Sequence, residues 1–185
     1  MLMGKNVVGS EGYIIGEFDG FYLDLNTWKA TAFYVDLSDE ARDELDFKKP
    51  LFSKIVICLP TQLIKVLGDV ITLVEPVRNL KDIAEKEKQL RSTKLDGKKI
   101  VSAKGYSLGE VEGLDVDIDN WQLTGLQVSL TDEAATELGF KRPIVSKVVV
   151  KIPTNIVSSV GNFITLDQSI ENLKSLVECI RSCKT

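Results

Sequence analysis

The 185-residue sequence contains no histidine and only three cysteines. The lack of histidine excludes Ser-His-Asp and Cys-His nucleophilic triads, imidazole general bases and every His-ligated metal site. Cys58, Cys179 and Cys183 are too few and too unevenly spaced for a secreted disulfide framework, so reduced thiols are expected. Two thiols without histidine do not complete a metal site within one chain. Catalysis by carboxylates or lysines remains possible, and a carboxylate-based hydrolase or metal enzyme is a competing hypothesis that paired inward carboxylates would support. Because the predicted inward positions are apolar, the sequence predicts no catalytic, cofactor-binding or metal-binding residue.

Long apolar runs and an excess of positive charge are also absent. No segment approaches the roughly 20 apolar residues that cross a bilayer, and the first residues lack the apolar stretch of a signal peptide. These features predict a cytoplasmic protein with no direct membrane insertion. The net charge is −4, whereas nucleic-acid binding usually needs a basic stripe along the protein. No nucleic-acid partner is therefore expected.

The most informative feature present is an internal repeat. Shifting the sequence by 93 residues aligns residues 4–83 with residues 97–176 without a gap, and about 33 of the 80 aligned pairs are identical. A period of this length suits a small independent domain and is too long for one unit of a solenoid. We therefore predict domains at residues 1–83 and 97–185, joined by a helical linker over residues 84–96.

Alternation of apolar and polar residues predicts strands at matching places in both copies. Residues 21–25, 33–37, 55–59 and 148–152 have period two, which places Leu23, Val35 and Ile57 on an inward face. These inward side chains offer no ligand to a metal ion or a cofactor. Val56 and Val149 are expected to point outward.

Short helices are predicted after the first hairpin and at the end of each copy. Ser38 and Thr131 resemble helix N-caps that are followed by two acidic residues, and these helices should end near residues 45–46 and 138–139. Apolar stripes then predict amphipathic helices from Leu80 and from Ile170, the second of which carries Cys179 and Cys183 one turn apart. The predicted fold is all-β with short helices: two tandem small β-barrels joined by a helical linker.

Both copies resemble the PRC-barrel domain family, named after a barrel in the H subunit of photosynthetic reaction centres. The resemblance rests on Gly4–Val8, Gly12–Glu17, Asp24 and Trp28, and on the later segment Lys54–Pro60, Gly68–Leu73 and Leu80. It implies a non-enzymatic adaptor that docks other proteins. The small archaeal members, which it resembles most, imply a role in cell division or in an envelope-associated assembly. A ribosome-assembly or RNA-associated factor remains the alternative.

Partner-binding residues are sought first among the features that both copies keep. In each copy a basic loop begins with an aromatic residue and a lysine. A tryptophan lies beside the turn of the first hairpin in each copy. Loop anchoring and packing at the end of a barrel are the competing interpretations of these aromatic residues. The residues are Phe47, Lys48, Phe140 and Lys141 in the loops, and Trp28 and Trp121 in the hairpins.

Two further candidates occur in only one copy. Tyr22 and Tyr34 are expected to be neighbours on the outer side of the first hairpin, as a contact surface for a partner or a homodimer, or as packing between the two copies. Asp115, Asp117 and Asp119 resemble the start of a calcium loop, but the remaining ligands of such a loop are missing. The spacing of the acids instead predicts a solvated strand face and turn.

Overall fold

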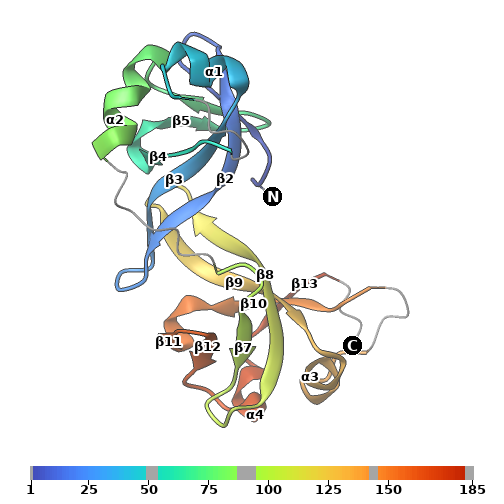
Figure 1. Cartoon of the computed structure of the whole chain (residues 1–185). Coiled ribbons are helices and arrows are strands. Elements are labelled where there is room, and N and C mark those ends of the chain that lie inside the picture. The colour runs from blue at the N-terminus through green and yellow to red at the C-terminus, as the bar shows by residue number, and fades with distance from the viewer. Residues whose placement is uncertain (1, 49–53, 87–94, 142–145, 182–185) are drawn as a thin grey trace. The chain divides into compact units, whose positions relative to one another are not determined.

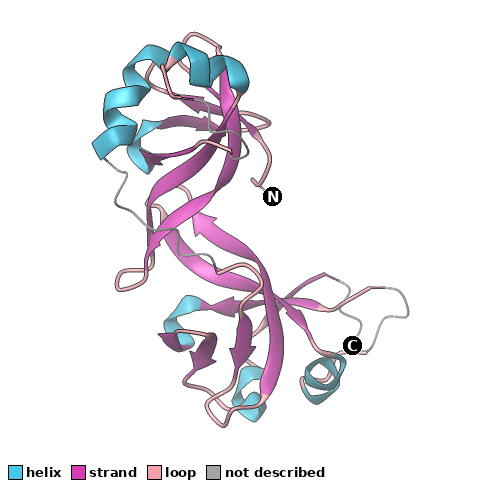
Figure 2. Ribbon diagram, in the orientation of Figure 1, coloured by secondary structure: helices cyan, strands magenta, loops and turns pink. Residues whose placement is uncertain are grey.

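The computed structural model describes residues 2–48, 54–86, 95–141 and 146–181. Of the described residues, 47% are in strands and 19% in helices, so the fold is all-β with short helices. Figure 2 shows this predominance of strands. The chain divides into two compact units, Met1–Asp24 with Lys29–Thr93 and Leu25–Trp28 with Lys94–Thr185. We describe each unit by itself.

The first unit consists of six strands with short helices between them. The strand order is β4-β3-β2-β1-β6-β5, in which β1 and β6 are parallel and every other neighbouring pair is antiparallel. Figure 1 shows β2 and β3 as the long twisted hairpin of this unit. Its elements are β1 (Asn6–Val8), β2 (Ile14–Asp24), β3 (Lys29–Leu37), α1 (Asp39–Glu44), β4 (Val56–Pro60), η1 (Thr61–Leu63), β5 (Ile64–Leu67), β6 (Ile71–Leu73), η2 (Val77–Asn79) and α2 (Leu80–Lys86).

The second unit has the same order with one strand added. Its strands run β13-β10-β9-β8-β7-β12-β11, again with one parallel pair, β7 with β12. Its elements are β7 (Lys99–Val101), β8 (Ser107–Asp117), β9 (Gln122–Leu130), α3 (Asp132–Glu137), β10 (Val149–Pro153), η3 (Thr154–Ile156), β11 (Val157–Val160), β12 (Phe163–Leu166), α4 (Ile170–Leu173) and β13 (Glu178–Arg181).

The bulges also recur at equivalent positions. In the first hairpin the pairing skips Asp19, between Phe18 and Gly20. In the second it skips Glu112, between Val111 and Gly113. A bulge adds one residue to one strand and bends that strand. Both hairpins are therefore bent at the same point, and each carries an acidic residue there.

Each unit has its own apolar core on one face of its sheet. In the first unit Phe33, Val35, Ile57 and Leu59 are buried in one cluster with residues of β1, β2, β6 and both helices. This agrees with the inward positions expected for Val35 and Ile57. Leu23, the third expected inward residue, is also buried. Equivalent residues are buried in the second unit: Ile100, Leu108, Val128, Val150, Ile152, Ile164, Leu166 and Leu173.

The short helix after each hairpin begins and ends where the sequence predicts. The Ser38 Oγ accepts a hydrogen bond from the Ala41 amide at 3.1 Å, and Thr131 Oγ1 accepts one from the Ala134 amide at the same distance. These side chains bond N–H groups that have no partner within the helix. The first helix is followed by Asp46 at φ 53° and the second by Gly139 at φ 89°, so the left-handed conformation follows both helices.

One glycine in each hairpin is required by a close approach of two backbones. A Cβ atom on Gly16 would lie 2.0 Å from the Asp36 carbonyl oxygen, and one on Gly109 would lie 2.1 Å from that of Ser129. No side chain fits at such distances. These glycines let the two paired strands of each hairpin approach closely at Gly16–Leu37 and Gly109–Leu130.

The predicted C-terminal amphipathic helix of the second copy is wrong beyond its first turn. Helix α4 ends at Leu173, whose carbonyl accepts hydrogen bonds from the amides of Leu176 and Val177. The chain then forms β13 antiparallel to β10. Pairing with the free edge of β10 satisfies backbone groups of both strands, and this outweighs a helical pattern that contains the β-branched residues Val177 and Ile180.

The segment between the copies is also only partly helical. Helix α2 continues the predicted helix to Lys86, residues 87–94 lie outside the described part of the chain, and the 96–97 segment forms a turn. Among the described helices, none is long and apolar enough to cross a membrane.

Candidate protein-interaction surfaces

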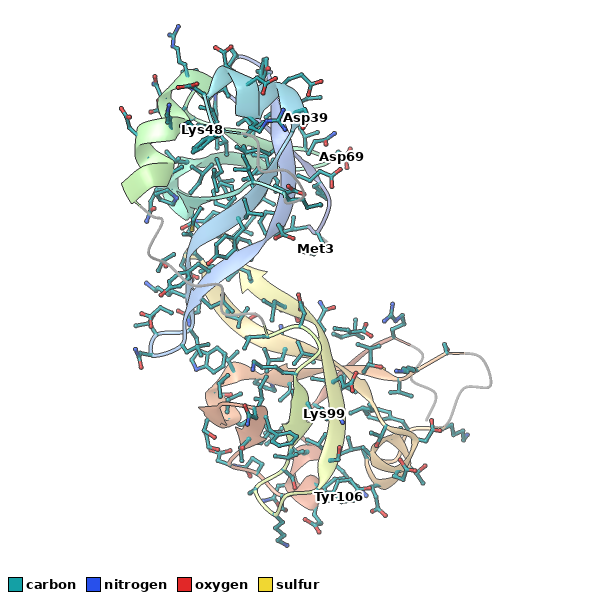
Figure 3. The ribbon with its side chains drawn as sticks, in the orientation of Figure 1. Met3, Asp39, Lys48, Asp69, Lys99 and Tyr106 are labelled. Atoms are coloured by element: carbon teal, nitrogen blue, oxygen red, sulfur yellow. The ribbon has the colours of Figure 1, made fainter. Side chains whose placement is uncertain are left out.

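The basic loop of the first unit follows α1 and is anchored by its aromatic residue. Phe47 packs against the core, and its amide donates a hydrogen bond to the Arg42 carbonyl at 3.0 Å. Lys81 lies 6.0 Å from the centre of the Phe47 ring and 3.3 Å from the Asp46 carboxylate. The neighbouring Lys48 is exposed at the same end of the unit as α1 (Figure 3). Phe47 therefore holds the loop, and Lys48 is the side chain available to a partner.

Arg42 fixes the charge pattern of the same helix. Its guanidinium bonds the carboxylates of Asp39 and Asp43. The hydrogen bond that Arg42 donates to the Asp43 carboxylate is the main reason that the pKa of Arg42 is raised, and Asp39 adds to it. Two of the four acids of α1, Asp39 and Asp43, are thus paired with Arg42, whereas Glu40 and Glu44 are exposed.

The second unit repeats this loop. The Phe140 amide donates to the Ala135 carbonyl at 2.8 Å, the half-buried ring follows the left-handed Gly139, and Lys141 is exposed. The loop residues 49–53 and 142–145 lie outside the described residues. Anchoring thus describes Phe47 and Phe140, whereas Lys48 and Lys141 keep the exposure that partner binding needs.

The two tryptophans share an unusual backbone conformation. Trp28 has φ 54° and Trp121 has φ 59°, and each ends the loop of its hairpin. A left-handed conformation is uncommon for a bulky residue, and glycine or asparagine normally occupies it. Both side chains are half-buried. Since both copies tolerate this backbone cost at the same position, the indole side chain is the property that they keep.

Tyr22 and Tyr34 are neighbours, as expected, but Tyr34 is not a surface residue. The pairs Tyr22–Ala32 and Gly20–Tyr34 are successive pairs on the same face of the hairpin. Both tyrosines belong to a small cluster on the face opposite the main core. Tyr34 is 8% exposed and packs with Ala32 and Cys58, while Tyr22 is half-buried. Alternation alone gave the correct face but not its burial. Tyr34 therefore contributes to packing in this structure.

The acidic hairpin of the second unit forms contacts within the unit itself. Asp117 accepts hydrogen bonds from the Asp119 amide at 3.0 Å and from the Asn120 side chain at 2.9 Å. Asp115 lies 3.4 Å from the Lys151 ammonium group. No group of three potential metal ligands occurs among the described residues. These carboxylates stabilise a turn and a strand face.

The cysteines match the expected reduced state only in part. Cys179 lies in β13 rather than on a helix, and it is disulfide-bonded. Cys58 is a buried, reduced thiol in the tyrosine cluster, as expected. Cys183 lies outside the described residues.

Sequence reasoning missed a row of charged residues on the outer face of the first unit. Val56, Asp36 and Glu17 are directly opposite one another on β4, β3 and β2. Lys54 forms an ion pair with Asp36, and the hydrogen bond that Lys54 donates to the Asp36 carboxylate is the main reason that the pKa of Lys54 is raised, with Glu17 and Asp19 contributing. The signal was present in the sequence as acids at the outward positions of both strands of the hairpin.

No family model and no curated protein matches this chain.

Proposed function

We propose that the chain is a non-enzymatic protein-interaction adaptor in which each unit is a small PRC-like barrel. The barrel interpretation is supported by the bulged hairpins and by the strand order, whose two end strands, β4 and β5, are joined through the short η1 helix. The buried Thr61 hydroxyl bonds the Ala30 carbonyl at 3.1 Å, and Thr154 bonds the Leu123 carbonyl at 2.9 Å in the second unit. This contact ties the end of each sheet back to its central hairpin.

One observation carries the adaptor proposal: the scaffold is the same twice, whereas the outer faces differ. Strand order, bulges, helix caps and the close approaches at Gly16 and Gly109 are shared. At the surface, the exposed Lys65 and Val66 of the first unit correspond to the exposed Ser158 and Ser159 of the second. A scaffold kept with altered surfaces is what two binding modules for different partners need, because specificity depends on differences at the surface.

The resemblance to small archaeal PRC-barrel proteins extends this proposal to a cell-division or envelope-associated assembly in the cytoplasm. It alone supports that extension. Proteins are the expected partners, and the exposed Lys48 and Lys141 favour acidic segments at the basic loops.

Photo-crosslinking in cells of the native organism tests the adaptor proposal. Benzoylphenylalanine would replace Lys48 or Lys141, with Gln62 and Asn155, an equivalent pair of exposed residues on η1 and η3, as matched controls. We expect discrete protein adducts, identified by mass spectrometry, from the loop positions but not from the controls. Adducts to RNA, or the same pattern from loop and control positions, would overturn the proposal.

A further inference from the structure

Apolar side chains surround Thr72 on the outer face of the first unit. The residues of β6 on either side of Thr72 are fully buried, so alternation along the strand directs Thr72 outward. Strand pairing places Val66 of β5 and Val8 of β1 on the two sides of Thr72, and Ile14 of β2 beyond Val8. The apolar residues of this Thr72 patch are Val8, Ile14, Val66, Val70 and Val74.

Most of the Thr72 patch is open to solvent. Ile14 and Val66 are 52% and 51% exposed, and Val70 and Val74 are 40% and 46% exposed. Neighbouring strands lie about 4.8 Å apart, so the patch spans about 14 Å across four strands, and residues 70–74 extend about 13 Å along β6. With the reach of its side chains the patch covers roughly a few hundred Å², and a contiguous apolar patch of that size is often functional.

The second unit lacks most of this patch although it has the same strands. Three of the five apolar positions are polar there, and all three polar residues are exposed. The scaffold itself therefore does not need apolar residues at these positions. The polar residues are Ser107, Ser159 and Asp167, in the places of Ile14, Val66 and Val74, whereas Val8 and Val70 correspond to Val101 and Phe163.

The two ends of the patch carry opposite charges. Lys65 is the bulged residue of β5 and is exposed. Glu17 is exposed on β2, three residues after Ile14. The second unit keeps the acid as Glu110 but has Ser158 in place of the lysine. The positive end and most of the apolar surface thus occur together in the first unit and are absent together from the second.

Opposite charges at opposite ends make the patch complementary to itself. In a two-fold dimer both copies use the same surface, and each contact occurs twice. A two-fold axis through Thr72 exchanges β5 with β1 and β2, so Lys65 of one copy approaches Glu17 of the other. Valine and isoleucine are stiff at the first side-chain torsion, so they lose little conformational freedom when they associate.

We propose that the Thr72 patch is the contact face between two copies of this chain, with an apolar centre and a Lys65–Glu17 ion pair at each end. An apolar centre within a charged rim is the usual anatomy of a protein interface, and the small size of the patch gives a weak, reversible dimer. The inference goes beyond the proposed adaptor function. Dimerisation doubles the number of basic loops in one assembly, which strengthens binding to a partner with repeated sites.

Sedimentation velocity of the full chain over a concentration series tests the dimer. We expect reversible association that increases up to about 1 mM, where even a weak complex is populated. A chain with both Ile14→Ser and Val66→Ser, which introduce the residues of the second unit, should associate at least about tenfold more weakly. A parent chain that is monomeric at every concentration would overturn the proposal.

A matched variant controls for the loss of exposed apolar surface. Ile118 and Phe163 of the second unit are 53% and 51% exposed, as much as Ile14 and Val66. A chain with both Ile118→Ser and Phe163→Ser should associate within about twofold of the parent chain. If this control loses association as the patch variant does, or if the patch variant associates like the parent chain, the Thr72 patch is not the contact face.

An exchange of charges separates a lost contact from a misfolded chain. Lys65→Glu and Glu17→Lys should each weaken association of the variant with itself by about fivefold, because each places like charges at both ends of the interface. An equimolar mixture of the two variants should recover association, since each end of the mixed dimer pairs a lysine with a glutamate. Glu110→Lys, the equivalent change in the second unit, should have no effect. A mixture that associates no better than either variant alone would contradict the assignment.

Discussion

At the scale of single residues, the scaffold depends most on positions where no side chain fits. Gly16 and Gly109 lie where the two paired strands of a hairpin approach most closely. The nearest atom to an added Cβ would be a backbone oxygen. A flexible side chain could move away from such a contact, but a paired backbone carbonyl cannot do so without breaking the sheet. The same requirement at the same place in both copies identifies this close approach as part of the fold itself.

Gly109→Ala should therefore destabilise the protein strongly, by about 3 kcal/mol or more. Gly161→Ala is the matched control in the same unit, because nothing lies within 4 Å of a Cβ atom there. Urea denaturation of both variants measures the difference in the free energy of unfolding. Equal effects of the two substitutions would show that the strands do not approach as closely as described.

Tyr34 gives a second prediction at this scale. Its ring is buried with Ala32 and Cys58, so Tyr34→Gln should lower the free energy of unfolding by about 2–4 kcal/mol. Tyr22→Asp should cost less, since Tyr22 is half-buried. Thermal melting of each single variant checks this order. A Tyr34→Gln chain as stable as the parent chain would contradict the burial of Tyr34.

Glu171 provides a test by titration. The hydrogen bond from Ser169, the bond to its own backbone amide and the charge of Lys104 lower the pKa of this carboxyl from 4.5. A carboxyl whose pKa is lowered in the folded state stabilises the fold at pH values above the pKa that this carboxyl has in the unfolded state. This contribution is lost as the pH falls through the folded-state pKa. Ser169→Ala should raise the pKa of Glu171 toward 4.5, as measured by NMR titration of its carboxyl carbon. An unchanged pKa would mean that Ser169 does not bond this carboxylate.

At the scale of elements, local chemistry determined what the sequence could predict. The caps at Ser38 and Thr131 and the left-handed ends at Asp46 and Gly139 are signals within one helical turn, and the structure has them as predicted. Strand β13 could not be predicted in this way. Its conformation depends on the edge of β10, about 30 residues earlier in the chain, whereas its own apolar spacing suits a helix.

The periodicity of apolar residues also could not predict which residues of the outer face are buried. Alternation placed Val56 and Val149 on the same face, yet one is exposed and the other buried. In the second unit β13 and the Arg181–Glu112 pair lie beside Val149, and they have no counterpart among the described residues of the first unit. The exposure of Lys48 and Lys141 was therefore predictable from the sequence, whereas the burial of Val149 was not.

The caps give the prediction that belongs to this scale. Ser38→Ala should cost about 1 kcal/mol of stability, because the Ala41 amide loses its hydrogen-bond acceptor. Ser38→Asp, which supplies another good acceptor, should remain within about 0.5 kcal/mol of the parent chain. Chemical denaturation compares the two, and a Ser38→Asp chain as unstable as Ser38→Ala would argue against a capping role.

At the scale of the whole molecule, duplication of one β-module is the basis of every proposal made here. The parallel pair that joins the first and last parts of each module forms between strands far apart in sequence, β1 with β6 and β7 with β12. Such long-range pairing is the feature that local sequence signals specify least. It is also the feature that both units share.

Inter-strand nuclear Overhauser effects in the full chain test this duplication most directly. We predict backbone contacts between Val7 and Ile71 and, in the same parallel register, between Ile100 and Ile164. Finding both sets would establish one scaffold present twice. Contacts in only one unit, or contacts that pair Val7 with Ile164 and Ile100 with Ile71, would contradict it.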